Sequence, residues 1–275
     1  MIHIVNVSYV MERLNTDQRN FAIVDCRFAL HDSSAGKQAY EKDHLPGAVF
    51  IDLEKDLSSP VREHGGRHPL PDFEKLADTL GKLGIDQETE VIAYDDQGGM
   101  FAARFWWLLK VLGHERVAVL DGGYGSWIKA GLPINKEIPQ LSEKQYTPAA
   151  QSKWEFVTAE QVKEALNQPG LQLIDSREQK RYFGLEEPID KVAGHIPGAV
   201  NFFWKDVLTT DGMWKSEEEL QSHFASLDPS KETIVYCGSG VSACPNILAL
   251  NRAGFKNVKL YAGSWSDWIS YPENC

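Results

Sequence analysis

The chain repeats itself, and this repeat constrains the fold more than any other feature of the sequence. An apolar run ends at Asp25 in FAIVDCR, and a matching run ends at Asp175 in LQLIDSR, 150 residues later. HLPGAV then matches HIPGAV, which pairs His44 with His195 at an offset of 151. EVIAYDDQGG matches ETIVYCGSGV, and LDGGYGSW matches YAGSWSDW. Because four blocks keep one order at nearly constant spacing, the sequence predicts two similar domains.

The stretch between the repeats, INKEIPQLSEKQYTPAAQSK, is polar and has no apolar periodicity, which is typical of a linker. We therefore expect a first domain over residues 1–140, a linker over 141–155 and a second domain over 156–275. A chain of 275 residues is long for one domain, and its 43% hydrophobic content is enough for two cores.

Short β-branched runs alternate with helix-like stretches in both halves. FEKLADTLGKLG and AARFWWLLKVLG each end at a glycine, as many helices do. The expected strands are Ala22–Val24, Val91–Tyr94, Val117–Leu120, Leu171–Ile174, Thr233–Tyr236 and Val258–Leu260. This alternation predicts α/β domains, each with a mostly parallel central sheet flanked by helices. Functional residues in such sheets lie at the carboxyl ends of strands, where Asp95 and Cys237 fall.

Composition restricts the partners and the compartment. The formal net charge of −11 repels phosphate backbones, so we expect no nucleic-acid partner. The N-terminal residues lack the pattern of a signal peptide, and no apolar run approaches the roughly 20 residues that span a membrane. Four cysteines in a chain of this length do not form a disulfide framework. We therefore expect reduced thiols, a cytoplasmic location and no membrane partner.

Cys237 carries the strongest chemical signal. It follows an apolar strand and opens the short loop Gly238–Ser242, which leads into a helix-like run after Pro245. Glycines let the backbone approach the sulfur, and successive N–H groups can then form an anion-binding nest at the helix N-terminus. Such a nest stabilises a thiolate, a bound anion or a persulfide. We therefore predict that Cys237 is the nucleophile, whereas its repeat partner Asp95 leaves the first half without one.

Other kinds of cysteine site fit the spacing less well. A phosphatase of the C-x(5)-R type needs an arginine at position 243, which is an alanine. A zinc site needs further ligands nearby, and Cys244 has no histidine close to it, so we expect no metal. His195 could serve a cysteine protease as the base, but its repetition as His44 favours a structural role. Cys26 has the character of a core residue, and Cys275 is terminal.

Together these motifs resemble the rhodanese family, and in particular its two-domain sulfurtransferases. The resemblance rests on the Asp-x-Arg motifs, on GHIPGA, on the cysteine loop and on the final Gly-Ser-Trp block. It implies that the first domain is catalytically silent and that the cysteine of the second accepts sulfane sulfur as a persulfide and passes it to a thiophilic acceptor. The loop CGSGVS is similar to that of the family's mercaptopyruvate enzymes. By this resemblance, the active-site loop consists of Cys237, Gly238, Ser239, Gly240, Val241 and Ser242.

The resemblance also implies substrate-binding residues. Arg181 matches the arginine that binds the donor anion, and Phe28, Met100, Phe101 and Trp204 match the pocket wall. In EEPIDKVAGH, the position of a second arginine in the mercaptopyruvate enzymes, Lys191 is the only lysine or arginine. Because the loop has no cationic side chain at Gly238 or Ser239, we expect only Arg181 and backbone dipoles to face the donor. Ser239 and His44 match a possible proton relay.

These expectations favour a sulfurtransferase that uses 3-mercaptopyruvate and no cofactor, with cyanide, a thiol or a thioredoxin-like reductant as acceptor. A loop without a cationic side chain at Gly238 or Ser239 favours the monoanionic donor. Two alternatives remain open: a thiosulfate:cyanide sulfurtransferase, and a non-catalytic module that carries a persulfide.

Overall fold

The computed structural model describes residues 3–16 and 20–274, so Cys275 lies outside the described residues. The chain forms two compact units, and each of them includes a short segment from the other half of the sequence. The first unit comprises the described parts of Met1–Ser59, Pro71–Lys153 and Gly212–Trp214. The second comprises those of Pro60–Leu70, Trp154–Asp211 and Lys215–Cys275. The sequence predicted two consecutive domains, whereas these units exchange the segments 60–70 and 212–214.

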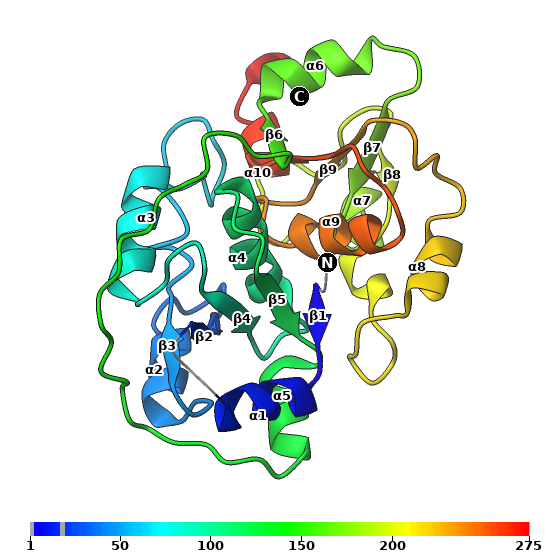
Figure 1. The fold of residues 1–275 in the computed structure, drawn as a ribbon. Helices are drawn as coiled ribbons and strands as arrows, with labels where there is room; N and C mark the ends of the chain where they lie inside the picture. The colour runs from blue at the N-terminus through cyan, green and yellow to red at the C-terminus, as the bar shows by residue number, and fades with distance from the viewer. Residues whose placement is uncertain (1–2, 17–19, 275) are drawn as a thin grey trace. The chain divides into compact units, whose positions relative to one another are not determined.

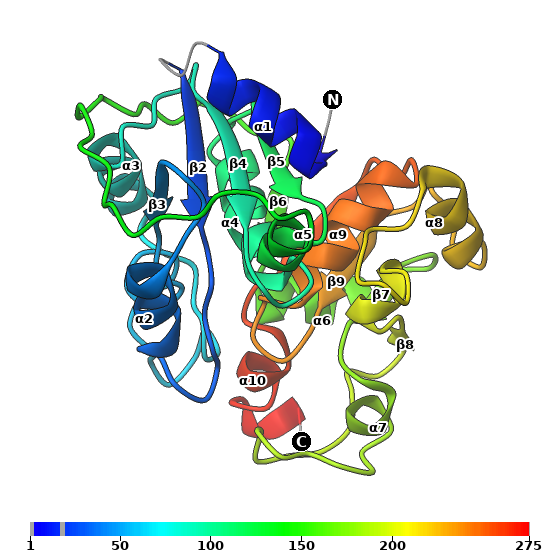
Figure 2. The same ribbon diagram turned by 90° about the horizontal axis from the view of Figure 1, so that it is seen from below.

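The first unit is built on a five-stranded sheet in which all neighbouring strands are parallel. Its strand order is β1-β5-β4-β2-β3. The strands are β1 (Ile4–Val5), β2 (Phe21–Asp25), β3 (Ala48–Phe50), β4 (Glu90–Tyr94) and β5 (Val117–Leu120). The helices are α1 (Val7–Asn15), α2 (Ala35–Lys42), α3 (Phe73–Lys82), α4 (Met100–Val111) and α5 (Gly123–Lys129). Figure 2 shows β2, β4 and β5 side by side.

The second unit repeats this plan, with the strand order β6-β10-β9-β7-β8 and parallel pairing throughout. Its strands are β6 (Glu155–Val157), β7 (Gln172–Asp175), β8 (Val200–Asn201), β9 (Thr233–Tyr236) and β10 (Val258–Tyr261). Its helices are α6 (Ala159–Leu166), α7 (Gln179–Tyr182), the 3-10 turn η1 (Trp204–Val207), α8 (Glu217–His223), α9 (Ala243–Arg252), α10 (Ser264–Trp268) and the 3-10 turn η2 (Pro272–Asn274). Figure 1 labels the main elements of both units.

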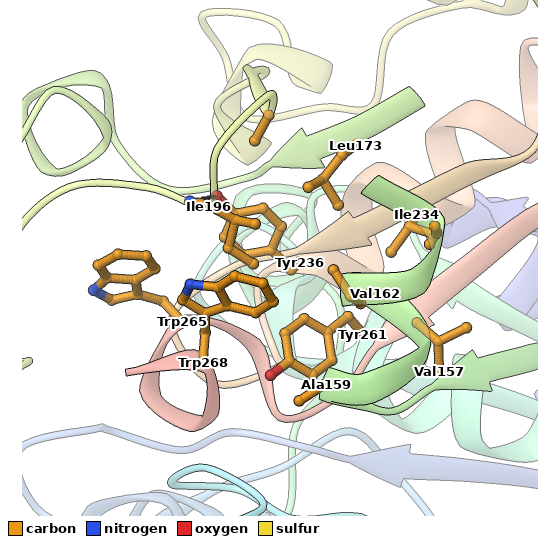
Figure 3. Packing of buried hydrophobic residues seen from close by; sticks show 12 residues of the cluster. Val157, Ala159, Val162, Leu173, Ile196, Ile234, Tyr236, Tyr261, Trp265 and Trp268 are labelled. Carbon is orange, nitrogen blue, oxygen red and sulfur yellow. Dashed lines mark hydrogen bonds between the residues drawn. The ribbon is translucent and has the colours of Figure 1, made fainter. Parts of the chain in front are cut away.

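The central strands form because they can be buried on both faces. All four residues of β9 are buried, and β4 is buried from Val91 to Tyr94. A parallel sheet covered on both sides favours such continuous apolar runs over alternating ones. In the second unit, β9 and β10 contribute Tyr236 and Tyr261 to a core that also contains Trp265 and Trp268 (Figure 3). This core fixes the carboxyl end of β9, where the cysteine loop begins, and that of β10, which leads to α10.

The predicted fold class is confirmed. The six expected strands all occur, and both predicted helices end as expected: α3 is followed by Gly84 and α4 by Gly113, with φ angles of +72° and +77°. Four short strands, β1, β3, β6 and β8, were not predicted. They have only two or three residues each, which is too short for a recognisable pattern. Among the described residues, no helix has the length and apolar character needed to cross a membrane.

Candidate active site

Cys237 lies immediately after the carboxyl end of β9, at the point where the chain turns into α9. Its side chain is only 1% exposed, and its sulfur accepts a hydrogen bond from the Gly240 N–H at 3.2 Å. Gly240 has a φ of +76°, and a Cβ at this position would lie 2.3 Å from the Ala262 carbonyl oxygen. Glycine is therefore required here both for the backbone angle and for space.

Val241 and Ser242 are the last two residues of the expected loop, and they lie where it turns into α9. Val241 is only 3% exposed, and its backbone carbonyl accepts the Cys244 N–H at 3.0 Å, in the turn that leads into α9. Its apolar side chain has no group that could bind an anion. Val241 was expected in the active loop, and only its backbone offers hydrogen-bonding groups there. Ser242 precedes α9 as the N-cap residue, but its side chain makes no capping hydrogen bond.

The chain around α10 holds the cysteine loop in place. The backbone N–H groups of Trp265 and Ser266 donate to the carbonyl oxygens of Cys237 and Gly238, both at 3.0 Å. Ser264 accepts the Cys237 N–H at 3.1 Å, and its Oγ lies 4.0 Å from the cysteine sulfur. Ser264 is also the one described non-glycine residue with a positive φ, at 57°. Strained backbone of this kind persists where the surroundings enforce it, and here it places the Ser264 hydroxyl between the Cys237 N–H, from which it accepts, and the Tyr261 carbonyl, to which it donates at 2.9 Å. Sequence reasoning did not identify Ser264.

The first unit has a corresponding loop, and its own carboxylate fills it. Asp95 accepts four backbone N–H groups at 2.7–3.0 Å, from Gln97, Gly99, Phe101 and Ala102. Burial raises the pKa of Asp95, while these four hydrogen bonds oppose the rise. The strand-to-helix turn of this fold is thus a nest for an anion. In the first unit an internal carboxylate occupies the nest, whereas the second unit presents a thiol.

Two arginines, rather than one, lie over the loop. A Cβ at Gly238 would lie 3.6 Å from both terminal nitrogens of Arg181, so this guanidinium lies next to the loop. It would lie 2.8 Å from Nη2 of Arg67. Burial lowers the pKa of Arg67 and the like charge of Arg181 lowers it further, while the Cys237 thiolate and Glu187 raise it. The expectation that Arg181 alone faces the donor is therefore wrong, because the exchanged segment 60–70 supplies a second guanidinium.

Buried carboxylates fix these arginines. Glu187 binds Arg181 through both of its oxygens, at 2.7–3.1 Å, and Asp190 binds the same guanidinium at 2.9 Å. Asp190 also pairs with Arg67. Charge-assisted bonds of this kind orient a guanidinium fork. The positions of the two guanidinium groups are therefore fixed by these ion pairs.

The exchanged segment also brings a histidine to the loop. Nδ1 of His68 lies 2.8 Å from the Ser239 hydroxyl, and both side chains are buried. The backbone of the segment is bonded to the α10 region, through Gly65 N–H to Asp267 at 2.7 Å and Arg67 N–H to Ser266 at 3.2 Å. Sequence reasoning anticipated a serine–histidine relay at Ser239 but did not consider His68.

His44, the histidine expected in that relay, has a different role. Its Nδ1 lies 2.8 Å from the Tyr40 carbonyl and its Nε2 lies 3.1 Å from that of Glu137, so backbone oxygens occupy both ring nitrogens. The ring also stacks on Tyr40. His195 repeats this arrangement, with Nδ1 at 2.8 Å from the Tyr182 carbonyl and its ring stacked on Tyr182. These histidines hold the turn before a strand in each unit, and the histidine in contact with Ser239 is His68.

Three of the four residues expected in the apolar wall belong to the first unit, and Trp204 belongs to the second. In the first unit, Phe28 and Phe101 make an edge-to-face contact at 5.5 Å between ring centroids, and Met100 is buried. In the second, Trp204 is buried, and its backbone N–H donates to the carbonyl of Ser176, which follows β7. In the part of the chain that the structure describes, no group of three or more His, Cys, Asp or Glu side chains could hold a metal ion.

A model of the rhodanese-like domain matches the chain twice, over residues 6–130 and 158–271. The chain is 47% identical over 255 residues to a protein from Pseudomonas aeruginosa named "Probable 3-mercaptopyruvate sulfurtransferase", covering 91% of this chain and 89% of that one. It is 38% identical over 256 residues to the thiosulfate sulfurtransferase of Rattus norvegicus, covering 90% and 84%. The 3-mercaptopyruvate sulfurtransferase from Leishmania major aligns with a TM-score of 0.83 at 30% identity, over 96% of this chain and 73% of that one.

Proposed function

Because this chain belongs to the rhodanese family and is a sulfurtransferase, we propose that Cys237 takes sulfur from 3-mercaptopyruvate and passes it on as a persulfide. The observation that supports this most directly is the buried Cys237 sulfur, which accepts an amide hydrogen bond beneath two guanidinium groups. The guanidinium groups of Arg67 and Arg181 are suited to a carboxylate, and the sulfur below them is suited to attack. Such juxtaposition is what nucleophilic catalysis requires.

In the first step, the Cys237 thiolate attacks the sulfur of the donor. A sulfur–sulfur bond forms, the donor's carbon–sulfur bond breaks, and its electron pair leaves on carbon as the enolate of pyruvate. The proton of the donor thiol is transferred to that carbon, which yields pyruvate and the Cys237 persulfide. The Asp95 nest supports this assignment, because a carboxylate and a persulfide both extend two bonds beyond Cβ and both carry negative charge.

The hydrogen bond between Ser239 and His68 supplies a route for that proton. A serine hydroxyl can donate and accept at once, and imidazole exchanges protons near neutral pH. We assign the pair to proton transfer between the donor thiol and the enolate carbon.

In the second step, a thiophilic acceptor attacks the outer sulfur of the persulfide and releases the Cys237 thiolate. Cyanide would leave as thiocyanate and a thiol as its own persulfide; a thioredoxin-like reductant is a further candidate. We also propose that Trp204 of the second unit contributes to the donor pocket. Among the described cysteines, Cys26, Cys237 and Cys244 are free thiols, which suits a reducing cytoplasm.

Parallel assays with two donors test the proposal. Sulfur transfer to cyanide is measured with 3-mercaptopyruvate and with thiosulfate, in the wild type and in Cys237→Ser and Cys244→Ser. We expect mercaptopyruvate to give the higher kcat/KM, Cys237→Ser to be inactive and Cys244→Ser to retain most activity. After treatment with donor alone, mass spectrometry should find one added sulfur on the peptide that contains Cys237. A higher kcat/KM with thiosulfate would favour the alternative donor, and an active Cys237→Ser enzyme would overturn the proposal.

A further inference from the structure

Asp190 joins the two arginines that lie over the cysteine loop. Its Oδ1 pairs with Arg67 and its Oδ2 accepts from Arg181 at 2.9 Å. The side chain of Asp190 is only 4% exposed, so little water screens these contacts. One carboxylate thus fixes two like charges that would otherwise repel each other beside Gly238.

The carboxylates around these arginines balance their charge. Arg67 and Arg181 carry two positive charges, and Glu187 and Asp190 carry two negative ones. The neighbouring Arg177 pairs with Asp175 at 2.6 Å and with Glu187 at 3.3 Å, so three arginines and three carboxylates balance one another. The donor-binding groups therefore offer directed N–H donors with no excess of positive charge.

We propose that Asp190 sets the charge selectivity of the donor site, so that a monoanionic thiol carboxylate is accepted in preference to dianionic thiosulfate. This inference rests on the proposed function and assigns a determinant of its specificity. A monocarboxylate can use the two oriented guanidinium groups and adds only one negative charge near Asp190. A dianion meets the same carboxylate with twice the charge and twice the repulsion.

Asp190 can be changed without removing the contacts that shape its loop. Its backbone N–H donates to Glu187 at 3.0 Å, and that bond does not depend on its side chain. Asp190→Asn keeps the size of the side chain and one carbonyl acceptor but removes the negative charge. Asp190→Glu keeps the charge and changes only the reach.

The experiment compares kcat/KM for the two donors in the wild type, Asp190→Asn, Asp190→Glu and Asp211→Asn. Asp211 is exposed, so its variant makes the same change in net charge away from the arginines. We expect Asp190→Asn to raise the thiosulfate-to-mercaptopyruvate ratio of kcat/KM by about tenfold, mainly through KM. Asp190→Glu and Asp211→Asn should leave the ratio within about twofold of the wild type.

An unchanged ratio in a folded Asp190→Asn enzyme, or an equal loss with both donors, would overturn the inference and leave the proposed function standing. A wild type that transfers sulfur from neither donor would overturn both. If Asp190→Asn does not fold, inhibition of the wild type by two anions of different charge tests the inference instead. Pyruvate, a monoanion, should compete with the donor at lower concentration than sulfate, a dianion; the reverse order would contradict the inference.

Discussion

At the scale of single residues, we expect His68 to transfer a proton that the reaction of mercaptopyruvate requires and the reaction of thiosulfate does not. The enolate released from mercaptopyruvate must be protonated on carbon, whereas sulfite leaves thiosulfate without a proton. His68→Asn preserves an acceptor for Ser239 but cannot transfer a proton. We expect it to lower kcat for mercaptopyruvate by about 10²-fold and to affect thiosulfate far less.

The matched control for this prediction is His64→Asn. His64 lies in the same exchanged segment, is exposed, and bonds Ser270 at 2.8 Å. Steady-state kinetics of this variant should stay close to the wild type with both donors. Equal losses for both donors in His68→Asn would assign His68 a structural role instead.

His114 predicts a pH dependence of stability. It is fully buried, and its Nε2–H donates to the Thr89 carbonyl at 2.9 Å. Burial lowers its pKa from 6.5 to about 4, so between these values the unfolded chain binds a proton that the folded chain excludes. Stability is therefore lost as the pH falls below 6.5, by about 2 kcal/mol between pH 7 and pH 5.

Urea unfolding at these two pH values measures this loss. His114→Gln, which keeps a donor but cannot be protonated, should remove most of it, while the exposed His31→Gln should not. If His114→Gln loses as much stability as the wild type on acidification, another group is responsible.

At the scale of elements, the cysteine loop depends on close contact with the chain that precedes α10. Gly240→Ala would place a methyl group 2.3 Å from the Ala262 oxygen and would also strain a φ of +76°. Gly198 has a similar φ of +81°, but no atom lies within 4 Å of a Cβ there. Both alanine variants should lose about 1–2 kcal/mol of stability from backbone strain.

Only Gly240→Ala should also lose activity, by about 10²-fold, since it alone displaces the loop from Ala262. Thermal unfolding and donor kinetics on the two purified variants separate the two effects. A Gly240→Ala enzyme as active as Gly198→Ala would show that the close contact is not needed for catalysis.

The sequence predicted those elements whose signal is local. β9, the glycine-rich turn and α9 form one continuous pattern, so Cys237 and its loop could be found from the sequence alone. The pattern did not predict which side chains of that loop are buried and which form hydrogen bonds. Val241 is buried and Ser239 bonds His68, and this difference depends on which chain segments cover the turn. The long helices α3 and α4 were recognisable as helix-like stretches that end at a glycine. His44 was misassigned because a match of motifs does not show which atoms its ring nitrogens contact.

Arg67 and His68 could not be found in this way, because they lie in a segment with no secondary structure of its own. A weak signal did exist in the repeat. The offset falls from 151 at His44 and His195 to 142 at Asp95 and Cys237, so the first half carries nine additional residues between these blocks. The unmatched stretch contains HGGRH, a group of potential functional side chains without a counterpart in the second half.

At the scale of the whole molecule, the exchanged segments predict what happens when the chain is cut between its halves. Residues 60–70 are bonded to the second unit through Asp267 and Ser266, and Trp214 N–H donates to Asp121 of the first at 2.8 Å. A protease site placed between the exposed Ala150 and Gln151 should therefore give two fragments that remain together and keep most of their activity.

Size-exclusion chromatography of the fully cleaved protein tests this expectation. One peak that contains both fragments is the expected result under native conditions, and urea should separate them. Two peaks under native conditions would show that the exchanged segments do not hold the cleaved chain together.

The same exchange limits how proteins of this plan can recombine. A crossover placed in the linker would separate Cys237 from the Arg67 and His68 with which it was selected, although both halves would be intact as genes. Arg67 and Asp190 would then come from different parents, and their charges would no longer be matched. Active chimeras should therefore take residues 60–70 and the C-terminal half from the same parent. The unit that recombines intact is then the set of residues around Cys237 and not one sequence repeat.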